Sequence, residues 1–259
     1  MDQLIFVSLL AAVGLFAGMV ALEELGRRIG LKRLAADPDA ARPGFGTIDG
    51  AVFALLGLLI AFTFSGAAAR FDERRKLVVE EANAIGTAYL RLDLLAADDR
   101  AELRGMLRDY IDARMEVYRL LPDFVAAKAA LDRSAALQQA IWSKSVAAAE
   151  RDNRTPATML LLPALNQMID ITTTRTMAAQ MHPPQVVFIL LCGLSLLCGL
   201  LAGIGMAGGQ RRSWIHMVGF AAVMAVTVYV ILDLEYPRLG LIQVDAVDQV
   251  LVEVRESMN

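Results

Sequence analysis

Hydrophobic positions along the chain gather into four long runs that contain no Lys, Arg, Asp or Glu. The runs span Gln3–Leu22, Gly50–Ala69, Gln185–Ala207 and Ser213–Leu232. Each is about 20 residues or longer, and at a rise of about 1.5 Å per residue such a helix crosses a hydrocarbon core of about 30 Å. The pattern therefore predicts four transmembrane helices, arranged as two pairs on either side of a polar middle segment.

The polar middle, from Arg70 to Pro184, has the periodicity of long amphipathic helices. Apolar residues recur at helical spacing with charges between them, and no stretch alternates as a strand would. We expect helices over residues 71–95, from an N-cap at Asp98 or Asp99 to Pro122, over 124–149, and from Thr155-Pro156 to His182-Pro183-Pro184.

These elements predict an all-α membrane protein with four transmembrane helices in two pairs flanking a long-helix extramembrane bundle. The boundaries are 1–69 for helices 1 and 2 with a basic connecting loop, 70–184 for the bundle, 185–234 for helices 3 and 4, and 235–259 for a tail. The tail is expected to form a short amphipathic helix that docks on the bundle or on a neighbouring subunit. Its apolar stripe consists of Val247, Val250, Leu251, Val254 and Met258.

Composition agrees with this architecture and narrows the function. The chain is 56% hydrophobic and only 20% charged, with a mean hydropathy of +0.49 and a net charge of -3. It has no dense basic and aromatic cluster, so nucleic acid is excluded as a partner. His182 and His216 stand apart from any Cys or carboxylate at metal-ligand spacing, and no nucleophile lies near a base in the sequence. We therefore expect no metal, no cofactor and no enzymatic activity.

The charges of the loops give conflicting indications of the orientation. The short loops after the first and third runs are basic, which favours placing them in the cytoplasm and the bundle outside. Arg70, Arg74, Arg75 and Lys76 follow the second run directly and favour the opposite orientation. We expect a multi-pass membrane protein with the bundle on the outer side, and the alternative orientation stays open.

Small residues four apart let membrane helices approach closely. Gly14 and Gly18 form one such pair in the first run, and Gly199 and Gly203 form another in the third. We expect both pairs to pack helices together, although glycine is also simply frequent in membrane helices.

The second run is the segment most suggestive of function. Gly57, Ala61, Ser65 and Ala69 form a stripe of small residues suited to helix packing, and bulky apolar residues project from neighbouring faces. In a ring of identical subunits such residues would form a hydrophobic constriction. The alternative is that the phenylalanines face lipid or the core. The pore-lining candidates are Phe53, Gly57, Ile60 and Phe64.

Charged residues at two helix ends suggest a contact between helices. Arg70 follows the second run, while Asp233 and Glu235 follow the fourth, and both ends lie on the same membrane side. We expect an ion pair between Arg70 and one of these carboxylates to hold the second and fourth helices together.

The stretch Gly57-Leu-Leu-Ile-Ala-Phe-Thr-Phe-Ser-Gly-Ala-Ala-Ala-Arg70-Phe-Asp-Glu-Arg-Arg75 and the segment Leu232-Asp233-Leu-Glu235-Tyr-Pro237 resemble the bacterial membrane family of unknown function described as bestrophin-like. Nearly the whole chain takes part in the resemblance. It implies a pentamer whose second helix lines the pore, with Phe53, Ile60 and Phe64 as the analogous residues. It also implies a cytoplasmic bundle, opposite to the reading from the short loops.

Polar residues that share the resemblance are expected to hold the bundle in register. They are Asn83, Arg91, Asn166, Asp170 and Arg175. Asn166 and Asp170 lie four apart on one helix face and are expected to meet Arg91 or Arg175.

The sequence thus favours an oligomeric membrane protein with a channel-like, ion-conducting role and a pore formed by the second transmembrane helix. Its partners would be membrane lipid, copies of itself and inorganic ions. The alternative is a non-conducting sensor or scaffold whose bundle binds a partner.

Overall fold

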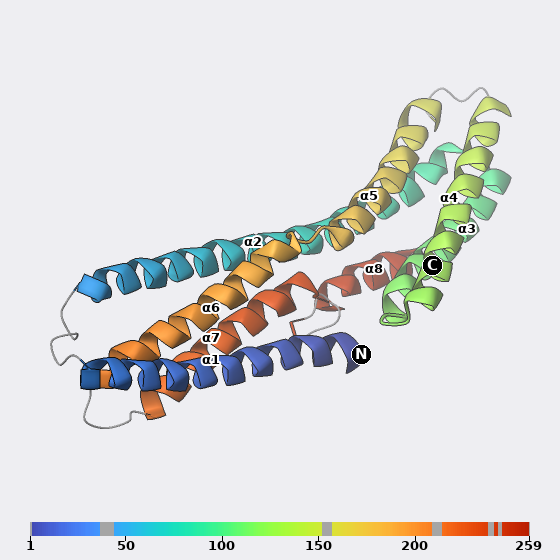
Figure 1. Ribbon diagram of the computed structural model, residues 1–259. Helices are drawn as coiled ribbons and strands as arrows, with labels where there is room; N and C mark the ends of the chain where they lie inside the picture. The colour runs from blue at the N-terminus through green and yellow to red at the C-terminus, as the bar shows by residue number, and fades with distance from the viewer. Residues whose placement is uncertain are drawn as a thin grey trace. The chain divides into compact units, whose positions relative to one another are not determined.

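The computed structural model describes residues 2–36, 44–151, 157–208, 214–237, 241–242 and 245–258, and within these ranges the chain is helical with no strand (Figure 1). The predicted all-α fold is confirmed. The helices are α1 Asp2–Ala36, α2 Gly44–Arg91, α3 Ala97–Arg119, α4 Phe124–Arg151, α5 Leu162–Gln180, α6 Gln185–Gly205, α7 Trp214–Glu235 and α8 Asp245–Ser257. Short helical turns cover Leu92–Leu94, Ala157–Leu161 and Met206–Gly208.

Four of the described helical segments are long and apolar enough to cross a membrane, and they overlap the four runs predicted from the sequence. They are Ser8–Ala36, Gly46–Leu94, Met159–Gly208 and Trp214–Glu235. Large apolar side chains are exposed on their surfaces, as is typical of helices that contact lipid. Val186, Ile189, Val223 and Val226 of α6 and α7 are examples of exposed large side chains.

The chain divides into two compact units. One comprises residues 2–69 and 182–236, here called the membrane unit, and the other comprises 70–181 and 237–259, here called the bundle unit. Helix α2 contributes to both, because its 48 residues run on without interruption from the apolar span into the charged segment. The second apolar run and the first helix predicted for the polar middle are therefore parts of one continuous helix.

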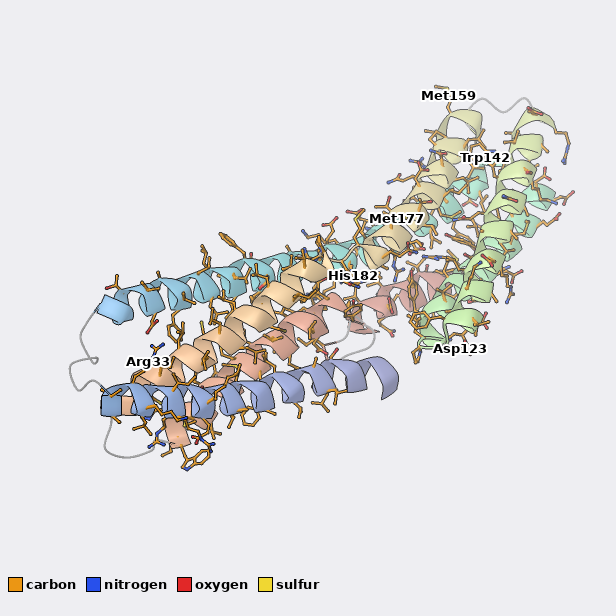
Figure 2. The ribbon with its side chains drawn as sticks, in the orientation of Figure 1. Arg33, Asp123, Trp142, Met159, Met177 and His182 are labelled. Carbon is orange, nitrogen blue, oxygen red and sulfur yellow. The ribbon has the colours of Figure 1, made fainter. Side chains whose placement is uncertain are left out.

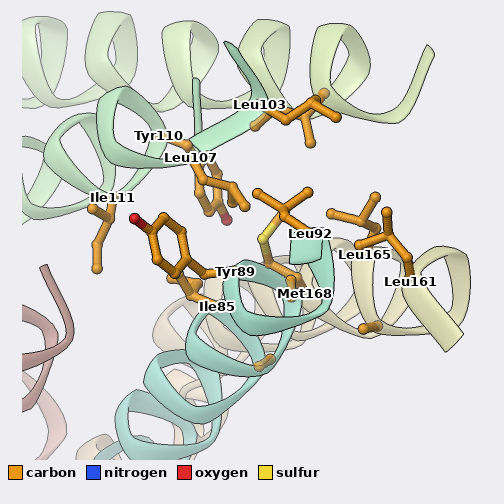
Figure 3. Close-up of a cluster of buried hydrophobic side chains, with 14 of the residues drawn as sticks. Ile85, Tyr89, Leu92, Leu103, Leu107, Tyr110, Ile111, Leu161, Leu165 and Met168 are labelled. Atoms are coloured by element: carbon orange, nitrogen blue, oxygen red, sulfur yellow. The ribbon is translucent and has the colours of Figure 1, made fainter. Parts of the chain in front are cut away.

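The core of the bundle unit is built from the apolar stripes that the sequence predicted (Figure 3). Ile85, Tyr89 and Leu92 face Leu103, Leu107, Tyr110 and Ile111 of α3, with Leu161, Leu165 and Met168 completing the cluster. Helix α8 packs on the same core. Leu251 and Met258 are buried in it, and Val247, Val250 and Val254 pack against it. The C-terminal tail therefore docks on the bundle of its own chain.

The helix ends are where the sequence predictions need correction. Helix α3 is capped by the backbone of Ala96, and Asp98 and Asp99 lie in its first turn. The N-cap prediction at these two residues was wrong, although carboxylates in a first turn still favour the helix dipole. At the start of α4, Asp123 is the residue that caps, because its Oδ1 accepts hydrogen bonds from the backbone N–H of Val125 at 3.1 Å and Ala126 at 3.0 Å.

The end of α5 is fixed by a side chain from α2. Arg74 is buried and donates hydrogen bonds from Nε to the carbonyl of Ala178 at 3.1 Å and from Nη2 to that of Met181 at 2.9 Å. It thereby satisfies carbonyls that the ending helix leaves open. His182-Pro183-Pro184 then separates α5 from α6, as predicted (Figure 2). The predicted start of the preceding helix at Thr155-Pro156 lies outside the described residues.

Candidate functional site

The membrane part of α2 is far less covered than the other spans. In its most apolar 18-residue stretch, 11% of the residues are buried, against 33% in the corresponding stretches of the segments that contain α6 and α7. Leu56 and Ala67 are the buried residues of this stretch. At about 100° per residue, these two mark one side of the helix, and the opposite side carries other residues. This outward side consists of Ala54, Leu58, Ala61, Phe62 and Ser65, all exposed.

The predicted pore-lining residues lie on a flank of α2, between the buried side and the outward side. The ring of Phe53 packs against Phe220 of α7, with the centroids 6.0 Å apart and a tilt of 59°. Ile60 is half-buried, Gly57 is exposed, and Phe64 is 44% exposed. Phe62, which the sequence analysis did not single out, is 68% exposed. Among the described side chains of α2, Phe62 is therefore the most exposed aromatic residue.

Glycines join α1 to α6 within the membrane unit. A Cβ added to Gly203 would lie 2.0 Å from the carbonyl oxygen of Glu23, so the two backbones touch there. Gly199 and Gly18 also face the partner helix. An added Cβ would lie 3.4 Å from the carbonyl oxygen of Met19 at Gly199, and 3.0 Å from the Leu196 side chain at Gly18. Gly14 has nothing within 4 Å. Of the other predicted packing residues, Ala61 and Ser65 are exposed on α2.

Two further glycines belong to this contact. An added Cβ would lie 2.1 Å from the carbonyl oxygen of Leu200 at Gly26, and 2.5 Å from the Cβ of Ala207 at Gly30. They repeat the four-residue spacing of the predicted pairs, a signal that the sequence analysis passed over because they stand among charges beyond the first apolar run.

The bundle unit contains a buried cluster of charges, which we call the Glu81 cluster. Glu81 accepts a hydrogen bond at Oε1 from Nε of Arg114 at 2.5 Å, and its Oε2 accepts one from Nη1 of Arg175. Both carboxylate oxygens and both arginines are buried. Arg175 also donates from Nη2 to Asp248 of α8 at 3.2 Å. Two positive and two negative charges thus balance, with Glu81 and the two arginines buried and Asp248 partly exposed at the edge of the cluster.

Aromatic groups complete the Glu81 cluster. The guanidinium of Arg175 lies over the ring of Tyr118 at 4.1 Å, and Arg114 donates to the Tyr118 hydroxyl at 2.9 Å. Burial alone would lower the pKa of Arg114, but Tyr118 and Glu81 outweigh it and hold this pKa above its ordinary value. The arginine therefore stays charged in the interior.

A neutral network lies beside this cluster. The Tyr110 hydroxyl and Thr172 Oγ1 are 2.8 Å apart, and Gln138 Nε2 donates to both at 3.1 Å. Burial raises the pKa of Tyr110 to about 12, with the charge of Glu81 adding to the effect. The hydroxyl thus keeps its proton at all ordinary pH values.

The predicted polar contacts of the bundle are distributed over several places. Asn166 Nδ2 donates to Asp170 Oδ2 at 2.9 Å, and these two residues and Asn83 line one open hollow of about 440 Å³. The expected arginine partners point elsewhere. Arg91 donates to the carbonyl of Leu160 at 2.6 Å, and Arg175 belongs to the Glu81 cluster.

The residues proposed for an ion pair lie in different units. Asp233 and Glu235 are buried at the end of α7, where the Tyr229 hydroxyl is 3.4 Å from Asp233 and His182 Nδ1 is 3.6 Å from Glu235. Arg70 is half-buried on α2, in the bundle unit. Its pairing with either carboxylate stays a prediction.

Four apolar spans and a helical bundle with its own core define this chain as a polytopic helical membrane protein. Residues 29–248 match the model of the Bestrophin-like domain. The chain therefore belongs to the Bestrophin-like family, and the resemblance noted from the sequence is confirmed. No curated protein matches the chain.

Solved structures of bacterial bestrophin homologues share the fold. A Klebsiella pneumoniae bestrophin homologue carrying a tyrosine-to-alanine mutation is 14% identical, with a TM-score of 0.66 over 92% of this chain and 98% of that one. A bestrophin homologue from the same organism carrying a tryptophan-to-alanine mutation is 13% identical, with a TM-score of 0.69 over 95% and 98%. At this identity the likeness establishes the architecture, and the function has to be argued from the residues.

Proposed function

We propose that the protein is a homo-oligomeric ion channel of the bacterial cytoplasmic membrane and that α2 lines its pore. Membership of the Bestrophin-like family supports a channel-like role in general and favours a channel over an enzyme. The finer proposal rests on one observation, the uncovered outward side of α2. In a ring of subunits, a helix that its own chain leaves uncovered is the one available to face the symmetry axis.

The chemistry of this helix fits a narrow apolar pore better than a simple lipid contact. Small residues alternate with bulky ones along the outward side, with Ala54, Ala61 and Ser65 beside Leu58 and Phe62. Small residues let neighbouring helices approach closely. Leu58 and Phe62 are one helical turn apart and 52% and 68% exposed, so copies of them would form consecutive apolar rings. A constriction of this kind gates ion flow by excluding water.

Phe62 and Phe64 are the two candidates for the narrowest point of the pore. Phe64, one of the four pore-lining candidates from the sequence, lies on the flank of α2 with Gly57 and Ile60, while Phe62 lies on the outward side. We assign the constriction to Phe62 and an interface between neighbouring subunits to Phe64. Phe53 is assigned to packing within the protomer, because its ring already contacts Phe220.

Ion flux from liposomes reconstituted with the purified protein tests this proposal. The wild type is compared with Phe62→Ala and Phe64→Ala, and the control is Val223→Ala, which trims an exposed side chain of α7. Oligomer mass is measured in parallel, with five subunits as the number implied by the likeness to bestrophins. We expect Phe62→Ala to raise the flux most, because a wider apolar ring wets more readily, and Val223→Ala to leave it unchanged.

Other outcomes would redirect the proposal. A rise with Phe64→Ala and none with Phe62→Ala would move the constriction to the flank predicted from the sequence. Folded oligomers that stay silent in every form would contradict conduction and favour a non-conducting sensor or scaffold whose bundle unit binds a partner.

A further inference from the structure

One carboxyl group of the membrane unit is buried without a hydrogen-bond partner among the described residues. Glu23 is fully buried, and among the residues that the structure describes neither of its carboxylate oxygens has a hydrogen-bond partner. It follows the first apolar run directly and belongs to the span Ser8–Ala36. A buried ionisable group in a membrane helix is expensive to maintain and calls for a functional explanation.

The place of Glu23 is the closest contact between α1 and α6, which we call the α1–α6 seam. Gly203 lies against the Glu23 backbone, and a Cβ added to Gly199 would lie 3.7 Å from Glu23 Cγ. Gly26 continues the contact one turn further along α1. The Glu23 side chain is thus buried at the place where the two backbones approach each other most closely.

Among the residues that the structure describes, no hydrogen bond or ion pair joins a basic side chain to Glu23, although Arg27, Lys32 and Arg33 lie further along the same helix. On α1, Glu24 and Arg28 bind each other at 2.8 Å, and no described contact joins Arg27 to Glu23. On α6 the titratable groups are the thiols of Cys192 and Cys198. On α7 they are His216, Tyr229, Asp233 and Glu235.

An ionised carboxylate in such a place would lose its hydration and gain neither an ion pair nor a hydrogen bond, which costs far more than burying the neutral acid. The lowest-energy state of the closed seam is therefore the one in which Glu23 carries a proton. When the proton leaves, the charge can be solvated only if α1 separates from α6.

We propose that Glu23 is a proton-binding site that holds the α1–α6 seam closed when occupied and lets it open when empty. The inference does not depend on the pore assigned to α2, because it concerns the packing of α1 on α6. The direction of the pH effect follows from the linkage between proton binding and closure of the seam. An exposed glutamate releases its proton above about pH 4.3, so raising the pH favours the open form and weakens the seam.

The first test uses the wild-type protein and an apolar reagent, dicyclohexylcarbodiimide. A protonated carboxyl adds to this reagent: its oxygen bonds to the central carbon, its proton moves to a nitrogen, and the acyl group then shifts to nitrogen. We expect mass spectrometry of protein in lipid to locate the adduct on Glu23 and not on Glu24. Buried glutamates can keep their protons up to about pH 8 or 9, so labelling should fall as the pH rises from about 6 to about 9. Labelling of Glu23 that is absent, or equal at every pH, would overturn the proposal.

The second test is a matched pair of variants. Glu23→Gln keeps the size of the side chain and imitates the neutral acid, whereas Glu24→Gln changes the neighbouring residue, which is partly exposed and paired with Arg28. We expect the thermal unfolding midpoint of the wild type and of Glu24→Gln to fall over the same rise in pH, and that of Glu23→Gln to change less. If Glu23→Gln retains the full wild-type slope, Glu23 is not the proton site. Neither test requires the protein to conduct ions, so failure here and failure of the channel proposal can be told apart.

Discussion

Glu81 is the residue on which the charges of the Glu81 cluster depend, because its carboxylate contacts both Arg114 and Arg175. Removing one partner of a buried ion pair leaves the others uncompensated, which costs about 3 to 5 kcal/mol. We expect Glu81→Ala to lower the free energy of unfolding by about that amount, measured by denaturant titration in detergent.

The adjacent residue offers a matched control for this prediction. Glu80 is exposed on the same helix, and Glu80→Ala should change the stability by no more than about 0.5 kcal/mol. Similar losses from the two substitutions would contradict a special role for Glu81.

Tyr110 gives a prediction about pH. Its folded-state pKa of about 12 lies above the value near 10 of an exposed tyrosine, so the folded state favours the protonated hydroxyl. This contribution to stability is complete below about pH 10 and is lost as the pH rises toward about 12. We expect the stability difference between wild type and Tyr110→Phe, followed by circular dichroism, to shrink over that interval. A difference that stays constant up to pH 12 would mean that the hydroxyl is not held as the structure indicates.

At the scale of the helix, the α1–α6 seam depends on glycines at defined positions. Gly203→Ala places a methyl group against the backbone of Glu23, and because backbone cannot move aside as a side chain does, the two helices must separate. We expect a loss of about 1 to 3 kcal/mol in SDS-induced unfolding.

The control is Gly14→Ala, which adds the same methyl group to α1 where nothing lies within 4 Å. It should be neutral or slightly stabilising, since alanine favours the helix over glycine. A Gly14→Ala protein as unstable as Gly203→Ala would place the helix contact elsewhere.

The helices themselves were predictable because their signals are local. Runs without charge, a period of 3.6 residues and the His182-Pro183-Pro184 break located α2, α5 and α6 well. The N-cap of α3 was predicted at Asp98 or Asp99 because aspartate is a common N-cap residue. The observed N-cap is Ala96, which has no side chain that could form a capping hydrogen bond. Capping by a backbone leaves no side-chain signature.

The candidate sites were less accessible to sequence reasoning because they depend on which helices meet. Arg114 occupies a position of the apolar stripe that contains Leu107, Tyr110 and Val117, which was the one hint that it is buried. Glu81 stands at the same helical spacing from Val78 and Ile85, but the hint was missed because a charge beside other charges is most often solvated. Glu23 beside Glu24 was missed for the same reason. Phe62 and Phe64 stand in similar sequence surroundings, so the sequence could not tell which of them is the more exposed. The structure distinguishes them by the exposed fractions of their side chains.

At the scale of the whole molecule, the uncovered outward side of α2 predicts where copies of the chain meet. Ser65 lies on that side, and around a symmetry axis the same residue of neighbouring subunits comes close together. In a background with Cys192 and Cys198 replaced by alanine, we expect Ser65→Cys to form disulfide-linked dimers in native membranes under mild oxidation. Val226→Cys, on an exposed part of α7 that we expect to face lipid, should stay monomeric on the same gel. If position 226 were to cross-link and position 65 were not, α7 rather than α2 would line the contact between subunits, and the pore proposal would have to be rebuilt around α7.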